Sequence, residues 1–319
     1  MDDTPAAQPD SPSPPAPSPK QRPARTFRQR IVRIAIRLGV LYAFVCLGLV
    51  LLESRLVFPG AYFDATPYFD ANRFTPENPI VGEVVTFPYD AVDGNELRGR
   101  LLIRDNADRV ILFLHGNGIR ATDMDGWTQR LSDAMNATVL TAEYRGYQDD
   151  DFTPSESSSI DDAVSAIDAL AVATKVPADE ITIYARSLGG GIGAGLVDAM
   201  QQRGAPPRSL ILDRTFDSVV NVGAKQFFWL PVRLLMRNRF DSVERLQNFS
   251  GNVVQIHGTP DRIVPMKNGR ALFESLSTKN KAWIETSDMY HNDRISRGTL
   301  VEALDQLKRF ESGSESPPE

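Results

Sequence analysis

The chain has 319 residues, enough for one large domain or two small ones, and its 42% hydrophobic and 24% charged content is ordinary for a globular protein. Its net charge of -6 offers no basic face for a nucleic-acid backbone, so we expect no nucleic-acid partner. The single cysteine, Cys46, excludes an intrachain disulfide and a cysteine-based metal site.

The N-terminal part combines a polar leader with an apolar stretch. Residues 1–30 begin with a run rich in Pro, Ala, Ser and Asp, which we expect to be disordered, and continue with a basic run. The stretch Leu38–Leu52 is uncharged. Extended back to Ile31 it is long enough for one transmembrane helix, because the arginines in the extension can snorkel toward the headgroups. The pattern therefore predicts a membrane anchor over 31–52.

Three other interpretations of this stretch compete with the anchor. A cleaved signal peptide is disfavoured by the long preceding region and by the absence of an A-x-A site before Glu53. A buried core helix would be entered through an unusual basic, Pro-rich leader, and an interfacial helix would need a polar face beyond Leu38. For an anchor, the positive-inside tendency predicts a cytoplasmic N-terminus and the remainder of the chain on the non-cytoplasmic side.

From about residue 84 the sequence alternates between short apolar runs and helical patterns. Two strand-like runs, 84–89 and 98–104, flank a turn signal at 93–95. Five further runs are rich in Val, Ile and Leu, as expected of strands buried on both faces, and cover 109–116, 137–144, 181–187, 209–216 and 252–258; a strand-like run follows at 282–286. Helical patterns cover 159–174, 191–204, 266–277 and 299–311. This alternation predicts an α/β fold with a mostly parallel sheet, helices on both faces and an antiparallel first pair of strands.

The composition shifts predict five parts of the chain: a leader at 1–30, an anchor at 31–52, a linker at 53–83, an α/β domain at 84–313 and a flexible tail at 314–319.

Within the α/β domain the alternation breaks over about 217–248, where the sequence is rich in Phe, Trp, Leu and Met. This apolar insertion between two strands is either a lid over a substrate pocket or an ordinary packed helical excursion, and the sequence alone does not decide between them.

A serine at the end of one predicted strand has the setting of a nucleophile. Ser187 ends the run 181–187 and opens a glycine-rich helical pattern, so a sharp strand-to-helix turn would expose its hydroxyl at the sheet edge. Such a turn needs small residues two positions before and after the serine, and Ala185 and Gly189 fill them. The G-x-S-x-G motif has therefore become A-x-S-x-G.

An acid and a base follow later strands. Asp261 lies in the loop after the run 252–258, where it could orient a histidine and stabilise its charged form. Asp213, after the preceding strand, is the rival for this role. His291 is the only histidine beyond the last predicted strand, which makes it the candidate general base. Ser187, Asp261 and His291 occur in the Ser, Asp, His order of one serine-hydrolase fold, and each lies just beyond a strand.

With these motifs, residues from roughly 84 to 311 resemble the Bem46-like, serine-aminopeptidase-type branch of the α/β-hydrolases. The matching stretches are FLHGNG (113–118), EYRGY (143–147), PSE (154–156), YARSLGGG (184–191), LPVRLLMRNRFDS (230–242), HGTPDRIVP (257–265) and YHND (290–293). Several proteins of that family are similar in having an N-terminal membrane segment. The departures are Ala185 for the usual glycine and DRTFDS at 213–218, and they affect the expected shape of the pocket.

The resemblance implies an α/β-hydrolase fold with Ser187 as nucleophile, Asp261 as acid and His291 as base. It also implies an oxyanion hole formed by the backbone N–H groups of Asn117 and Leu188. The remaining two histidines, His115 and His257, match positions that look structural in the family.

The expected activity is acyl transfer to water through an acyl-enzyme on Ser187, with an ester, thioester or amide as substrate. A membrane tether and an apolar insertion make a lipid or long-acyl ester substrate a reasonable hypothesis. No metal and no organic cofactor is expected. Two alternatives stay open, namely a non-catalytic binding or scaffold protein of this fold and an acyltransferase that uses an acceptor other than water. The sequence does not indicate the oligomeric state.

Overall fold

The computed structural model describes residues 26–63, 82–148 and 151–313. The predicted disordered run at the start of the leader, the tail 314–319 and most of the predicted linker lie outside these ranges. The chain divides into two compact units, Met1–Leu47 and Gly48–Glu319.

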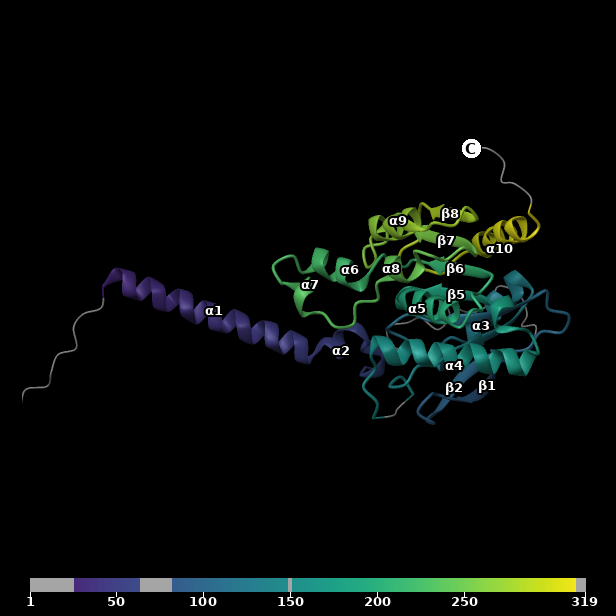
Figure 1. Ribbon diagram of the computed structural model, residues 1–319, viewed down its shortest axis with the longest axis horizontal. Helices are drawn as coiled ribbons and strands as arrows, with labels where there is room; N and C mark the ends of the chain where they lie inside the picture. Colours follow the sequence, from purple (N-terminus) through teal and green to yellow (C-terminus); the bar gives the residue numbers. More distant parts are fainter. Residues whose placement is uncertain (1–25, 64–81, 149–150, 314–319) are drawn as a thin grey trace, which may run out of the picture. The chain divides into compact units, whose positions relative to one another are not determined.

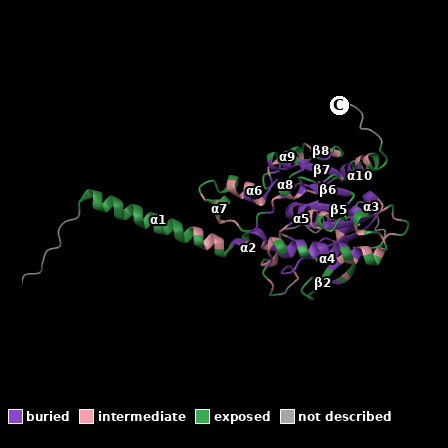
Figure 2. Ribbon diagram, viewed as in Figure 1, coloured by how far each residue is buried: buried purple, intermediate pink, exposed green. Residues whose placement is uncertain are grey.

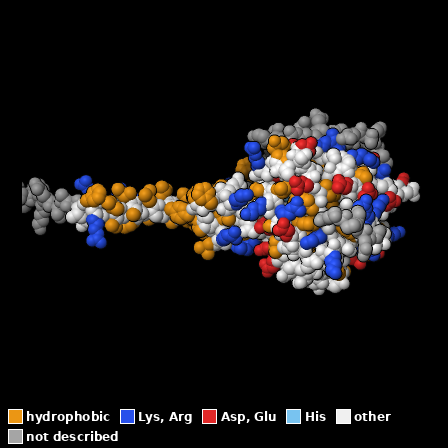
Figure 3. All heavy atoms as spheres, turned by 90° about the horizontal axis from the view of Figure 1, so that it is seen from above, with side chains coloured by type: hydrophobic (Ala, Val, Ile, Leu, Met, Phe, Trp, Pro, Cys, Tyr) orange, Lys and Arg blue, Asp and Glu red, His pale blue; other side chains and the backbone are white. Residues whose placement is uncertain are grey.

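The described part of the first unit is helical. Helix α1 spans Phe27–Leu51, contains no acidic residue or proline, and buries none of its residues. Basic side chains lie near the start of the helix, and apolar side chains gather along the surface that follows (Figure 3). At about 1.5 Å per residue its 25 residues span about 37 Å, longer than a hydrocarbon core of about 30 Å. Among the described residues it is the one helix long and apolar enough to cross a membrane.

The second unit is built on an eight-stranded sheet with the order β1-β2-β4-β3-β5-β6-β7-β8 (Figure 1). The strands are β1 (Val85–Asp90), β2 (Glu96–Leu102), β3 (Arg109–Leu114), β4 (Ala137–Thr141), β5 (Thr182–Arg186), β6 (Ser209–Asp213), β7 (Asn252–Gly258) and β8 (Lys281–Thr286). β1 pairs antiparallel with β2, β2 pairs antiparallel with β4, and every other pairing is parallel. The predicted parallel sheet with an antiparallel edge is therefore confirmed.

Helices cover both faces of this sheet, as predicted, and the central strands are buried between them (Figure 2). Alternate residues of a strand face opposite sides. In β3, Ile111 and Phe113 pack in one core with α3 (Asp125–Met135) and α10 (Arg297–Glu311). Leu112 and Leu114 pack in the other core with α4 (Glu156–Thr174), α5 (Leu188–Gln202) and α9 (Met266–Ser275).

The predicted elements differ from the observed ones mainly at their ends. β4 ends at Thr141, three residues before the end of the predicted run, and β6 ends at Asp213 rather than at residue 216. In both places the chain stays buried after the ladder ends, so hydropathy does not mark the last paired residue. Helix α3 was not predicted, because its few apolar residues are outnumbered by polar ones.

The insertion at 217–248 contains three short helices, α6 (Val219–Gln226), α7 (Val232–Leu235) and α8 (Ser242–Leu246). The other short elements are α2 (Glu53–Val57) and the 3-10 turns η1 (Pro59–Ala61), η4 (Ala121–Asp123) and η5 (Ala178–Glu180). α2 and η1 fall in the segment predicted as a linker, and they are part of the second compact unit.

Candidate active site

Ser187 stands at the turn between β5 and α5, in a backbone conformation that L-residues rarely adopt. Its φ of 54° and ψ of -121° place it in a strained region, as expected for a nucleophile elbow. The turn brings α5 against β3 so closely that a Cβ at Gly189 would lie 2.1 Å from the carbonyl oxygen of Leu114. Only glycine fits there, which explains the glycine of the A-x-S-x-G motif.

The structure brings together the three residues predicted from the sequence. The hydroxyl of Ser187 lies 2.9 Å from Nε2 of His291, and Nδ1 of His291 lies 2.7 Å from Oδ2 of Asp261. Because an ionised carboxylate only accepts, Nδ1 carries the hydrogen and Nε2 is left free to accept from Ser187. The three residues follow β5, β7 and β8, whose carboxyl ends meet at one edge of the sheet.

The Asp261 carboxylate is fixed by its own loop. Its Oδ1 accepts from the backbone N–H groups of Ile263 and Val264, each at 2.9 Å. The rival carboxylate, Asp213, has different partners: Arg214 binds it at 2.7 Å and the hydroxyl of Tyr184 donates to it at 3.0 Å. The geometry thus favours Asp261 as the partner of the histidine.

Two buried arginines support the loop that carries His291. Arg186 Nη2 donates to the His291 carbonyl oxygen at 2.8 Å, and Arg214 Nη1 donates to the same oxygen at 3.0 Å. Arg214 also donates to the carbonyl oxygens of Tyr290 and Asp293. Sequence reasoning missed both arginines. The available signals were an arginine at the last position of β5 and an arginine directly after β6.

The buried environment changes the proton affinity of these groups. Burial lowers the pKa of His291, although the hydrogen bond that its ring donates to Asp261 acts in the opposite direction. The imidazole is therefore neutral at pH 7 and able to accept a proton. Burial and the nearby Arg214 lower the pKa of Arg186 to about 10, which leaves that guanidinium charged at neutral pH.

Two backbone N–H groups are placed near Ser187 without a protein acceptor among the described residues, those of Asn117 and Leu188. Leu188 is the first residue of α5, where helix N–H groups have no partner within the helix. Both residues line the same cavity as Ser187. The two N–H groups are therefore the candidate donors of an oxyanion hole.

The other two histidines are held as structural groups. His115 is buried, its Nε2 lies 3.3 Å from Glu143, and its ring contacts those of Tyr144 and Tyr147. His257 is also buried, and its Nε2 donates to the carbonyl oxygen of Val264 at 2.9 Å. In the described part of the chain, the histidine hydrogen-bonded to Ser187 is His291 and not either of these two.

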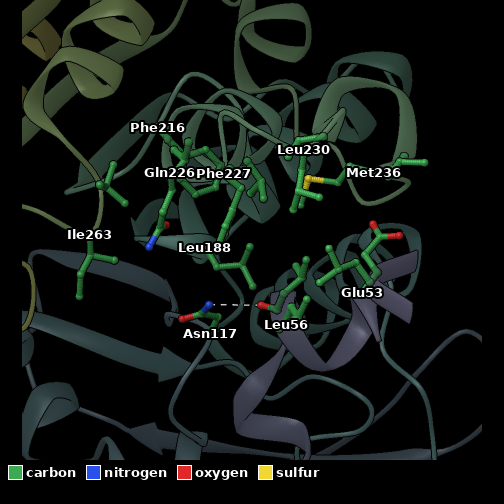
Figure 4. Close-up of a pocket in the computed structure, with 18 of the residues that line it drawn as sticks. Glu53, Leu56, Asn117, Leu188, Phe216, Gln226, Phe227, Leu230, Met236 and Ile263 are labelled. Carbon is green, nitrogen blue, oxygen red and sulfur yellow. Dashed lines mark hydrogen bonds between the residues drawn. The ribbon is translucent and has the colours of Figure 1, made fainter. Parts of the chain in front are cut away.

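A cavity of about 400 Å³ opens onto Ser187 and is lined mainly by apolar side chains (Figure 4). Its walls come from the end of α1 beyond Gly48, from α2, from the helical insertion and from the loop after β7. Representative lining residues are Leu56, Phe216, Phe227, Leu230, Met236 and Ile263. Between the two interpretations of the insertion, its position over this cavity favours a lid. Across the described residues, no group of three or more His, Cys, Asp or Glu side chains could hold a metal ion.

An eight-stranded, mostly parallel sheet with a serine elbow after its fifth strand, an acid after the seventh and a histidine after the eighth defines the α/β-hydrolase fold. Comparison with known proteins agrees. The chain resembles a Pyrobaculum calidifontis esterase with a TM-score of 0.61 and 15% identity, over 85% of this chain and 98% of the esterase. The predicted α/β-hydrolase fold is therefore confirmed.

No model of a known protein family matches the chain. Its homologues include an uncharacterized protein of Mycobacterium tuberculosis, 32% identical over 177 residues, which are 55% of this chain and 60% of that protein. They also include the lysophosphatidylserine lipase ABHD12 of Danio rerio, 28% identical over 187 residues, covering 54% of this chain and 48% of the lipase. The chain thus spans about half to three fifths of the length of these relatives. None of them singles out the Bem46-like branch, which stays a prediction.

Proposed function

We propose that the chain is a serine hydrolase that cleaves an acyl ester through a covalent intermediate on Ser187. The observation that carries the proposal is the continuous hydrogen-bond chain from Ser187 through His291 to Asp261. A serine hydroxyl is a weak nucleophile until an adjacent base removes its proton, and a buried neutral histidine in this position is such a base.

The reaction follows from the positions of these groups. Ser187 Oγ attacks the ester carbonyl while His291 Nε2 takes the hydroxyl proton, and Asp261 stabilises the resulting imidazolium. The negative oxygen of the tetrahedral intermediate accepts hydrogen bonds from the N–H groups of Asn117 and Leu188. The intermediate collapses, and the leaving alcohol takes the proton from His291. Water, deprotonated by His291, then attacks the acyl-enzyme and releases the acid with regeneration of Ser187.

The proposed substrate is an ester of a long acyl chain. The cavity beside Ser187 is apolar, and burying each methylene contributes about 0.8 kcal/mol, or up to about fourfold in binding. The relative from Danio rerio is named a lysophosphatidylserine lipase, which is consistent with a lipid ester as substrate. The value of kcat/KM should therefore rise with acyl length until the cavity is filled.

The proposed location is a membrane, with α1 as a single anchor, the N-terminus in the cytoplasm and the hydrolase unit on the other side. The basic residues before the apolar stretch support this orientation. Protease added to intact cells or spheroplasts should then digest the hydrolase unit. Digestion only after lysis would contradict the orientation.

The function is tested by labelling the full chain in detergent micelles with a fluorophosphonate probe, which reacts with an activated serine. Labelling and ester hydrolysis should disappear in Ser187→Ala and persist in Ser250→Ala, which changes an exposed serine away from the site. Absence of labelling in a folded wild-type chain would reject the hydrolase and leave a binding protein of the same fold.

A further inference from the structure

The residues that directly follow the apolar helix are folded into the hydrolase unit. We refer to Glu53–Gly60 as the post-helix segment. Within it Glu53, Val57, Phe58 and Gly60 are buried. The ring of Phe58 packs edge-on against that of Phe240, with centroids 6.0 Å apart. The segment therefore belongs to the core and is not a free tether.

One end of the post-helix segment holds Asn117, which the proposed mechanism uses as an oxyanion donor. The N–H of Gly60 donates to the Asn117 carbonyl oxygen at 2.9 Å, and Nδ2 of Asn117 donates to the Val57 carbonyl oxygen at 3.2 Å. The hydroxyl of Tyr147 adds a third bond to Asn117, at 3.1 Å. The carbonyl, the side chain and the N–H of a residue all extend from one Cα, so holding the first two restricts the direction of the N–H.

Gly60 lies so close to this loop that no side chain fits. A Cβ at Gly60 would lie 2.8 Å from Cε1 of Tyr147 and 2.9 Å from the Asn117 carbonyl oxygen. The position needs glycine for this close approach, because a methyl group would press on the peptide that follows Asn117.

The other end of the segment holds the lid. Glu53 Oε1 accepts from the backbone N–H groups of Arg237 and Asn238, at 2.8 and 2.7 Å, and from the Asn238 side chain at 3.0 Å. Its Oε2 accepts from Arg237 Nε at 3.1 Å. Residues 237 and 238 connect α7 to α8, so one carboxylate fixes the base of the helical insertion over the cavity.

We propose that the post-helix segment positions two parts of the active site, the oxyanion donor Asn117 through Gly60 and Val57, and the lid through Glu53. This inference rests on the proposed hydrolase function. It makes Gly60 and Glu53 positioning residues with separable effects: disturbing Gly60 impairs transition-state stabilisation, whereas disturbing Glu53 impairs the binding of the acyl chain.

The first test compares Gly60→Ala with Gly48→Ala in the full chain in detergent micelles. At Gly48 an added Cβ has no atom within 4 Å, so this variant controls for the substitution itself. Sites are counted by exhaustive fluorophosphonate labelling, so that kcat refers to folded sites only. Losing one oxyanion donor lowers kcat by about 100- to 1000-fold. We expect Gly60→Ala, which displaces the donor, to lower kcat at least about tenfold with KM within twofold, and Gly48→Ala to match the wild type.

Should Gly60→Ala fail to fold, Asn117→Ala removes only the side-chain bond to Val57 and keeps the backbone N–H. It should lower kcat severalfold for short and long esters alike. If a folded Gly60→Ala or Asn117→Ala variant has the same kcat per labelled site as the wild type, the role of the segment at the oxyanion hole is rejected.

The second test uses Glu53→Gln, which leaves Arg237 Nε facing an amide N–H, with Glu274→Gln on the exposed side of α9 as the matched control. We expect KM for a p-nitrophenyl laurate to rise at least about threefold, while kcat for p-nitrophenyl acetate stays within twofold. Unchanged KM for both esters would reject the role at the lid. A wild-type chain that neither labels nor hydrolyses esters would reject the proposed function itself, and the inference with it.

Discussion

Arg214 lies beneath the loop that carries His291 and donates a hydrogen bond to its carbonyl oxygen at 3.0 Å. The arginine is fully buried, and its other guanidinium atoms bind the carboxylate of Asp213 at 2.7 and 2.9 Å. Its own backbone has a φ of 47°, unusual for a residue with a side chain. The position of His291 is therefore set from two directions, by Asp261 on its ring and by Arg214 on its backbone.

Arg214→Met should destabilise the protein by about 3–5 kcal/mol, because it removes the only arginine hydrogen-bonded to the buried Asp213 carboxylate and leaves Arg186 Nε at 4.0 Å as the remaining charge among the described residues. The matched control is Arg203→Met, which removes an exposed ion pair with Asp168 and should cost less than about 1 kcal/mol. Denaturant unfolding measures both free energies. Equal effects of the two substitutions would mean that the buried pair does not contribute as inferred.

The pH dependence of hydrolysis should follow the lowered pKa of His291. The neutral ring accepts the proton from Ser187, so activity is lost as pH falls through the folded-state pKa of this histidine. Because burial sets that pKa below 6.5, the acid limb of kcat/KM should have its midpoint below pH 6.5. Asp261→Asn should lower kcat by about 10⁴ and move the midpoint further down, since Asp261 raises this pKa. A midpoint above 6.5 in the wild type would contradict this account.

Stability should also fall in mild acid. His257 and His291 both have folded-state pKa values below the model-peptide value of 6.5, chiefly because they are buried. The contribution of these two histidines to the free energy of unfolding is complete above pH 6.5. It is lost as pH falls from 6.5 toward their folded-state pKa values, because the unfolded chain binds these protons first. Unfolding free energies between pH 7.5 and 5 should show this slope, and His257→Gln should reduce it. If His257→Gln leaves the slope of unfolding free energy against pH unchanged, groups other than His257 cause that slope.

Much of the fold and the catalytic candidates could be predicted from local sequence. Buried parallel strands are short apolar runs, and the positions of Ser187, Asp261 and His291 just after such runs predict that all three lie at one edge of the sheet. Strand ends were less predictable, because the chain after β4 and β6 remains buried while it builds the site.

The supporting contacts could not be predicted, since each joins segments that are distant in sequence. Glu53 meets Asn238 across 185 positions, and Arg186 meets the His291 carbonyl across 105. A single glutamate or arginine carries no periodic pattern that would reveal such a partner. The sequence therefore indicated the candidate catalytic groups, whereas the structure reveals which groups hold them in place.

The serine elbow offers a paired test of why the motif departs from G-x-S-x-G. Gly189→Ala should abolish folding to an active form, because its Cβ would lie 2.1 Å from the Leu114 carbonyl oxygen, which belongs to rigid β3. Ala185→Gly should keep kcat within a few-fold and cost about 0.5–1 kcal/mol in stability, since glycine loses more backbone freedom on folding. Fluorophosphonate labelling and denaturant unfolding of both variants measure these effects.

The methyl of Ala185 lies 2.9 Å from where a Cβ at Gly193 would stand. Gly193→Ala should therefore be destabilising alone and partly rescued by Ala185→Gly. Additive effects in that double variant would show that Ala185 and Gly193 do not pack against each other as the elbow geometry requires.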